Sequence, residues 1–140
     1  MCIRDSSNVF VHAILKPSRR LKRHEAEIKE NAKSILKRIE EGEAAATTVV
    51  HVSEVANILE SRTTREESWR ILTALVSMRG VSLIGVTGDT YRAAIQASSV
   101  LGVGVNDALA YIAMAGAGVN EAYSFDKHFD QLPEIKRITS

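Results

Sequence analysis

The sequence predicts an α/β domain in which helices cover both faces of a short parallel sheet. Short apolar segments alternate with longer segments of helical periodicity, which is the pattern of parallel strands joined through helices. The segment Ala108–Ala115 contains only apolar or small residues, so we expect a helix that is buried on all sides. The chain has 140 residues, of which 45% are hydrophobic, and this suits one domain spanning residues 1–140.

The first part of the chain is predicted to be mainly helical. Ser7–Leu15 is an apolar helix that Pro17 ends, and Ser18–Glu41 is a long surface helix that Gly42 stops. The apolar stripe of that long helix consists of Ile28, Ile35, Leu36 and Ile39. After it we expect an extended segment at Ala44–Thr48, a helix at Val49–Ser61 capped by Thr47 or Thr48, and a helix from Thr63 or Thr64 to about Arg79. The inner residues of this last helix are predicted to be Trp69, Ile71, Leu72, Leu75 and Val76.

The second part is predicted to complete the sheet. The expected elements are a strand at Val81–Val86, a helix at Tyr91–Leu101 introduced by Gly88-Asp89-Thr90, the buried helix around Ala108–Ala115, a strand at Glu121–Phe125 and a last strand at Ile135–Thr139. Asp107 stands at the beginning of the buried helix, where a carboxylate caps the helix or binds a cation. Asn106 is an equally good cap, so capping alone does not require Asp107.

Composition excludes several classes of protein. The net charge of +1 gives no overall field for nucleic acid or membrane, and no stretch has the length of a transmembrane helix. Cys2 is the single cysteine, which rules out an internal disulfide framework and fits the reducing cytoplasm. The four histidines show no zinc-type spacing, and we interpret His51 and His128 as structural or supporting residues. Gly102-Val-Gly104 lacks the dinucleotide pattern and is interpreted as a turn.

Three acids stand in settings that differ from the solvated helix faces carrying most of the others. Glu54 has Val50 and Ile58 as its helical neighbours, Asp107 begins the apolar helix, and Asp126 directly follows a strand. The carboxyl end of a strand is where α/β sheets place their ligands. Each acid alone is more often structural than functional. Together they predict a site where repelling carboxylates need a cation, and Mg²⁺ or Mn²⁺ prefers such oxygen ligands.

Four motifs carry a resemblance to a known family. They are Asn8-Val-Phe-Val-His, Thr47-Thr-Val-Val-His-Val-Ser-Glu54, Asn106-Asp107-Ala-Leu and Ser124-Phe-Asp126-Lys-His-Phe-Asp130. In this order they resemble PIN-domain ribonucleases, and the chain is most similar to VapC-like toxins of type II toxin–antitoxin pairs. The resemblance implies a three-layer α/β/α fold and Mg²⁺- or Mn²⁺-dependent hydrolysis of RNA. It also implies metal binding by Glu54, Asp107 and Asp126, supported by Asn8 and Ser124.

The first acid of the family pattern is where this chain departs from it. The pattern places an aspartate at position 6, which here is Ser6, and Asp5 stands one residue too early. A slip of one residue turns a strand side chain to the opposite face. Asp5 therefore substitutes as catalytic and metal-binding residue only if the backbone bulges. Met1–Asp5 also matches the translation of a sequencing-library adapter, and we expect these residues to replace native ones.

The resemblance further implies an RNA substrate, a homodimer and a VapB-like antitoxin partner. A basic run, consisting of Lys16, Arg19, Arg20, Lys22 and Arg23, is either a solvated helix start or the phosphate-contacting rim of an RNA cleft. Two other interpretations remain open at this point. One is a PIN nuclease of RNA processing without an antitoxin, and the other is an inactive RNA- or protein-binding module, for which Ser6 is the only support.

Overall fold

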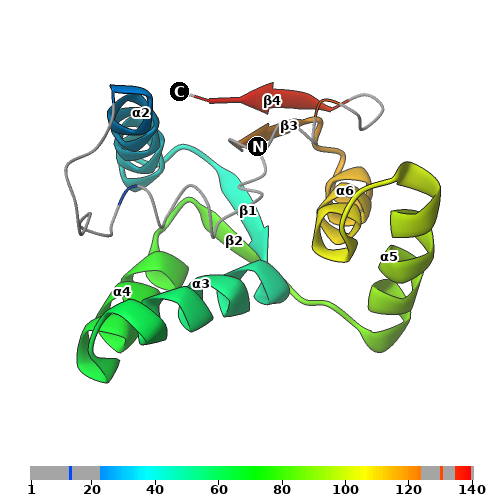
Figure 1. The fold of residues 1–140 in the computed structure, drawn as a ribbon, viewed down its shortest axis with the longest axis horizontal. Coiled ribbons are helices and arrows are strands. Elements are labelled where there is room, and N and C mark those ends of the chain that lie inside the picture. Colours follow the sequence, from blue (N-terminus) through cyan, green and yellow to red (C-terminus); the bar gives the residue numbers. More distant parts are fainter. Residues whose placement is uncertain (1–12, 14–22, 124–129, 131–134, 140) are drawn as a thin grey trace.

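The computed structural model describes residues 13, 23–123, 130 and 135–139. Helices lie on both sides of short strands, so the chain has the three-layer α/β/α arrangement that its sequence predicts (Figure 1). The elements are α2 (Arg23–Glu40), β1 (Ala45–Thr48), α3 (Val49–Arg62), α4 (Arg65–Ser77), β2 (Val81–Ile84), α5 (Gly88–Leu101), α6 (Val105–Ala117), β3 (Glu121–Tyr123) and β4 (Lys136–Ile138).

The described strands form two parallel pairs. β1 pairs with β2 from Ala45 opposite Val81 to Thr48 opposite Ile84, and β3 pairs with β4 from Glu121 opposite Lys136. Parallel neighbours require crossover connections, which helices α3 and α4 supply between β1 and β2. The predicted parallel sheet is therefore confirmed for these strands.

The end of α2 follows from one glycine. Gly42 has a φ of +107°, a conformation that side chains disfavour and glycine adopts readily. The backbone N–H of Glu43 donates to the carbonyl of Arg38 at 3.1 Å, and that of Gly42 donates to the carbonyl of Ile39 at 3.0 Å. These two bonds satisfy carbonyls that the helix end leaves without partners. The predicted stop at Gly42 is correct, while the predicted beginning of this helix at Ser18 lies outside the described residues.

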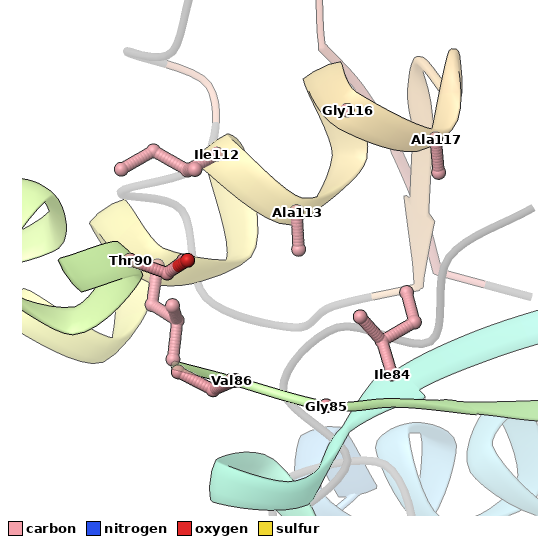
Figure 2. Close-up of a pocket in the computed structure, with 9 residues that line it drawn as sticks. Ile84, Gly85, Val86, Thr90, Ile112, Ala113, Gly116 and Ala117 are labelled. Atoms are coloured by element: carbon pink, nitrogen blue, oxygen red, sulfur yellow. The ribbon is translucent and has the colours of Figure 1, made fainter. Parts of the chain in front are cut away.

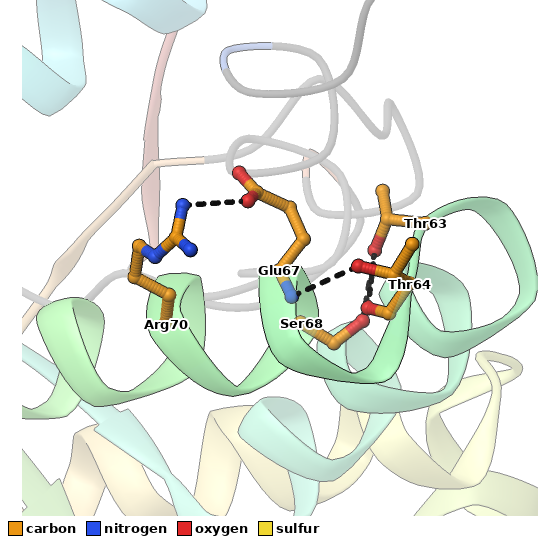
Figure 3. A network of polar contacts seen from close by, with 5 residues as sticks. All are labelled: Thr63, Thr64, Glu67, Ser68 and Arg70. Atoms are coloured by element: carbon orange, nitrogen blue, oxygen red, sulfur yellow. Dashed lines mark hydrogen bonds and ion pairs between the residues drawn. The ribbon is translucent and has the colours of Figure 1, made fainter.

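Threonines begin and separate α3 and α4. The Thr48 side chain accepts from the backbone N–H of His51, and the Thr64 side chain accepts from that of Glu67 at 3.2 Å. Figure 3 shows the second junction, where the Thr63 and Ser68 hydroxyls are 2.8 Å apart and Arg70 donates to Glu67 at 2.9 Å. Threonine at the cap with glutamate three residues later is a sequence signature of a helix start. Both predicted caps are confirmed.

Several predicted boundaries are wrong or untested. β2 ends at Ile84 rather than Val86, and α5 begins at Gly88 rather than Tyr91. The reason for the second difference is Thr87, whose side chain accepts from the backbone N–H of Thr90 and starts the helix early. The predicted helix Ser7–Leu15 lies outside the described residues except for Ala13, which is helical.

Buried apolar residues form two clusters. The first core cluster joins α2, β1, α3, α4 and β3, and consists of Ala32, Ile35, Ile39, Ala45, Val55, Leu59, Leu75 and Tyr123. The second core cluster joins the α5–α6 turn, α6 and β3, and consists of Val103, Ala108, Ala110, Met114 and Ala122. Strand β3 contributes to both because successive side chains of a strand point to opposite faces.

Two residues assigned to the inner face of α4 are on its outside. Trp69 is 69% exposed and Val76 is 40% exposed, whereas Leu75 is buried. Val76 follows Leu75 by one position, which turns the side chain by roughly 100° around the helix axis. Trp69 lies on the same side as Val76 because seven residues make about two turns. The expectation that these two residues are inside this domain is therefore wrong.

Helix α6 is buried or half-buried up to Met114 but exposed in its last turn, which corrects the expectation of burial all round. Ala108, Leu109, Ala110 and Met114 are buried, but Ala115 and the two residues after it are exposed. The exposed positions are Ala and Gly, whose apolar side-chain surface is small, so their contact with water costs little free energy. No single described helix is long and apolar enough to cross a membrane, and α5 and α6 reach that length only as a pair bent by 109°.

A charged network fastens the end of α2 to β3. Arg38 donates to Glu43 Oε1 at 2.9 Å and to the Tyr123 hydroxyl at 2.9 Å, and Tyr123 donates to Glu43 Oε2 at 2.7 Å. Burial raises the pKa of the Tyr123 phenol, and its bond to Glu43 raises it further. Burial also acts to raise the pKa of Glu43, but hydrogen bonds from Tyr123 and Arg38 and the charge of Arg38 outweigh it and lower that pKa. The network therefore keeps the phenol neutral and the carboxylate charged.

Candidate functional site

Two of the predicted acids lie on helices that come together at the carboxyl end of β1. Glu54 lies on α3, which starts directly after β1, and Asp107 lies in the first turn of α6. Both are half-buried. Thr48, the last residue of β1, contacts His51, and His51 contacts Asn106 beside Asp107. The starts of α3 and α6 therefore face each other at the edge where parallel sheets place their ligands.

Asn106 connects the two helices directly. Its Nδ2 donates to Glu54 Oε1, across 52 positions of sequence. Its Oδ1 accepts from the Tyr91 hydroxyl at 2.9 Å, and Tyr91 belongs to α5. One side chain thus contacts α3 and α5 while standing on α6. In the sequence, Asn106 is recognisable only as a possible helix cap and as part of a family motif, and no pattern marks Tyr91 as a site residue.

His51 supports the same junction through its buried ring. Its Nε2 is 3.1 Å from the backbone carbonyl of Asn106, and its Nδ1 is 2.6 Å from the Thr48 hydroxyl. A carbonyl oxygen only accepts, so Nε2 carries the proton and Nδ1 accepts from Thr48 in the neutral ring. The Thr48 oxygen also accepts the backbone N–H of His51 at 3.2 Å. His51 is 2% exposed, and these contacts bear out its interpretation as a supporting residue.

Asp107 is not the cap of α6. The N-cap position is Gly104, so Val105 and Asn106 are the first two helical residues and Asp107 is the third. A carboxylate in this first turn is stabilised by the positive end of the helix dipole. A Cβ built on Gly104 would be 3.6 Å from Asp107 Oδ2, which shows that the carboxylate lies over the helix start. Asn106 is not the cap either, because its amide is bonded to Glu54 and Tyr91.

The remaining predicted site residues lie outside the described residues, with one exception. Asp5, Asn8, Ser124 and Asp126, together with Lys16, Arg19, Arg20 and Lys22, are not described. Arg23 is described, is exposed and pairs with Glu27 at 3.7 Å on the surface of α2. Exposed pairs of this kind contribute little stability, so the guanidinium can exchange its partner.

The described acids fit a hard divalent cation by their donor chemistry. Glu54 and Asp107 offer carboxylate oxygens, which Mg²⁺ and Mn²⁺ prefer over nitrogen or sulfur. Among the described residues no group of three or more His, Cys, Asp or Glu side chains lies close enough together to hold a metal. The predicted donor set therefore has two described members, Glu54 and Asp107, while Asp126 and the first acid lie outside the described residues.

A separate pocket lies between α6 and the connection from β2 to α5. Its volume is about 400 Å³, and its lining is apolar apart from Thr90, as Figure 2 shows. The lining residues are Ile84, Gly85, Val86, Thr90, Leu109, Ile112, Ala113, Gly116 and Ala117. Neither Glu54 nor Asp107 is among them. Because phosphates bind charged or N–H-rich surfaces, this pocket is not the RNA site that the acids predict.

Open α/β sheets bind their ligands at the carboxyl ends of the strands, and in this chain two acids lie on the helices that come together at that edge. The family model of the PIN domain matches residues 7–135, so the chain belongs to the PIN-domain family. No curated protein matches the chain in sequence.

Two solved structures have the same fold. VapC20 of Mycobacterium tuberculosis, described as a toxin that cleaves the sarcin–ricin loop, is 16% identical with a TM-score of 0.65, over 90% of this chain and 89% of that one. VapBC2 from Rickettsia felis, bound to a DNA fragment from its promoter, is 14% identical with a TM-score of 0.67, over 99% and 98%. The likeness extends over nearly the whole of each chain and establishes the three-layer fold.

Proposed function

We propose that this protein is a metal-dependent ribonuclease that hydrolyses RNA phosphodiester bonds and acts as the toxin of a toxin–antitoxin pair. The observation that carries the proposal is the junction of α3 and α6, where Asn106 binds Glu54 next to Asp107. Membership of the PIN-domain family and the likeness to VapC structures support the same reaction. Glu54, Asp107, Asp126 and an acid at the end of the first strand would hold Mg²⁺ or Mn²⁺.

The cation, when bound, supplies positive charge that activates water and offsets charge on the reacting phosphate. The residues of the chain do the rest. Glu54 and Asp107 concentrate negative charge at one place, and Asp107 is held by the first turn of a helix rather than by a loop. One of the carboxylates accepts the proton that the attacking water loses. Asn8 and Ser124 assist the acids, and the basic residues from Lys16 to Arg23 contact RNA phosphates.

The partners follow from the same proposal. We place a VapB-like antitoxin over the acidic site and a second copy of the chain in a homodimer, acting in the cytoplasm. Support comes from the likeness to VapBC2, which by its name contains both toxin and antitoxin components. A gene for a small antitoxin beside this gene is the expected genomic finding, and its absence would favour an RNA-processing nuclease.

Asp107→Asn tests the proposal because it keeps the shape of the side chain and removes one charge. We expect RNA cleavage in Mg²⁺ or Mn²⁺ to fall on the order of a hundredfold, the scale of losing a key electrostatic group at a reaction centre. Without metal the melting temperature should stay equal or rise, because repulsion among carboxylates decreases. Metal should also raise the melting temperature of the parent more than that of the variant.

A second arm concerns the first acid. Ser6→Asp should raise cleavage strongly, because it restores the position of the family pattern, whereas Asp5→Ala should matter little. Cleavage that depends on Asp5 and ignores Ser6→Asp would show that the first acid is Asp5. An Asp107→Asn chain that cleaves at the parent rate would overturn the metal site itself.

A further inference from the structure

We infer that Asn106 is a positioning residue that sets the Glu54 carboxylate beside Asp107, and that Tyr91 fixes the orientation of its amide. This inference rests on the proposed metal site and names residues that the site requires beyond its acids. Its basis is a chain of contacts through four elements: Thr48 at the end of β1, His51 and Glu54 on α3, Asn106 on α6, and Tyr91 on α5. All five are described residues, and in the two side-chain contacts of Asn106 the donors are Asn106 Nδ2 and the Tyr91 hydroxyl.

The amide of Asn106 can stand in only one way. An ionised carboxylate accepts hydrogen bonds and does not donate them, so the NH₂ group of Asn106 must face Glu54. The carbonyl oxygen then faces Tyr91, whose hydroxyl donates at 2.9 Å. A flipped amide would place two acceptors against each other at Glu54. Tyr91 therefore does more than fill space, because its hydroxyl donates to the amide oxygen in the orientation that Glu54 requires and so holds the side chain there.

A neutral donor suits a carboxylate that has to bind a cation. An arginine or lysine at position 106 would also orient Glu54, but its positive charge would oppose the approach of a metal ion. The amide holds one oxygen without changing the net charge of the site. Asn106 thus supplies the orientation of the site, and Glu54 supplies its negative charge.

The backbone of Asn106 is held as well as its side chain. His51 Nε2 contacts its carbonyl at 3.1 Å, and His51 is itself oriented by Thr48. Asn106 and Asp107 are consecutive residues of the first turn of α6. Fixing Asn106 to α3 at two atoms therefore fixes Asp107 relative to Glu54. Groups that orient the ligands of a metal typically change its affinity by about 10- to 100-fold when they are removed.

The experiment measures metal affinity separately from catalysis. Titration calorimetry with Mn²⁺ alone is carried out on a full-length parent chain that carries Ser6→Asp, which restores the first acid, and on N106A, Y91F and N106A/Y91F in the same background. We expect the dissociation constant to rise about 10- to 100-fold in N106A, and to rise less in Y91F. In the double variant it should equal that of N106A, because Tyr91 acts through Asn106 and coupled residues are not additive. With RNA, kcat should fall while KM stays near the parent value.

Ser98→Ala is the matched control. Ser98 lies on α5 as Tyr91 does, is half-buried, and donates to the backbone carbonyl of Val103 at 2.6 Å. Loss of this hydrogen bond should lower the melting temperature and leave Mn²⁺ affinity unchanged. N106A should give the same two results if the role of Asn106 is merely structural. An N106A chain that melts lower but binds Mn²⁺ like the parent overturns the inference. If N106A fails to fold, Y91F decides, and parent affinity in Y91F overturns the orienting role of the tyrosine. A parent chain that binds no Mn²⁺ overturns the proposed function and this inference with it.

Discussion

Two glutamates stand on either side of β1 and are held by opposite chemistry. Glu43, before the strand, accepts from the charged Arg38 and from Tyr123. Glu54, after the strand, accepts from the neutral amide of Asn106. The positive charge of Arg38 balances the ionised Glu43 carboxylate and makes it part of the framework that joins α2 to β3. The amide of Asn106 orients Glu54 and itself adds no positive charge, which suits the metal-binding role that we propose for Glu54.

Exchanging each glutamate for its amide should separate the two roles, and gives the largest expected effect. Glu54→Gln should reduce RNA cleavage on the order of a hundredfold or more, with a small change in the free energy of unfolding. Glu43→Gln should leave cleavage near the parent rate and lower the free energy of unfolding by about 1–2 kcal/mol, because hydrogen bonds to a charged acceptor are weakened. RNA cleavage rates measure the first effect, and urea unfolding measures the change in the free energy of unfolding. A larger loss of cleavage from Glu43→Gln would break the comparison.

The framework around Glu43 also depends on a close backbone approach at Gly80. A Cβ at position 80 would lie 2.5 Å from the backbone oxygen of Glu43, and that oxygen belongs to the turn before β1. Gly80→Ala should therefore lower the free energy of unfolding by about 1–3 kcal/mol, the usual cost of overpacking. Gly116→Ala is the control, since it lies in α6 with nothing within 4 Å. It should stabilise by roughly 0.5–1 kcal/mol, and equal effects at both positions would contradict the steric argument.

The smallest expected effect is on the free energy of unfolding at low pH. The folded-state pKa of Glu43 is lowered, although burial acts against it, by the bonds from Tyr123 and Arg38. A lowered carboxyl pKa stabilises the fold above the unfolded pKa of about 4.3, and this contribution is lost as pH falls through the folded value. The parent should therefore lose more stability than Glu43→Gln below about pH 5, by less than about 1 kcal/mol. Urea unfolding at stepwise lower pH measures it, and identical slopes would show that Glu43 is not the titrating group.

Local signals made most of the fold predictable. Gly42, Thr48 and Thr64 mark helix ends by their own chemistry, and the helix–strand alternation predicts parallel pairing without knowledge of contacts. Exposure was harder, because Trp69 and Ala115 are apolar residues whose burial depends on which neighbours pack against them. Apolar character alone assigned both to the interior, and the structure places both outside.

Part of the candidate site is likewise visible in the sequence, and part is not. The unusual settings of Glu54 and Asp107 are visible in the sequence, since each acid interrupts or begins an apolar pattern. The contacts of Asn106 with Glu54 and Tyr91 are not visible, because they join positions 52 and 15 residues apart and arise only when α3, α5 and α6 pack together. Asp126 and the first acid remain predictions, since they lie outside the described residues.

The candidate site lies between helices that pack in two different core clusters. Helix α3 contributes Val55 and Leu59 to the first core cluster, while α6 contributes Ala108 and Met114 to the second. Proteins open in cooperative units smaller than the whole fold, and hydrogen exchange detects such openings. Separation of the α5–α6 unit would carry Asp107 away from Glu54 while the first core cluster stays folded. The site therefore lasts only as long as that docking, and exchange of the α6 amides measures how readily this unit opens.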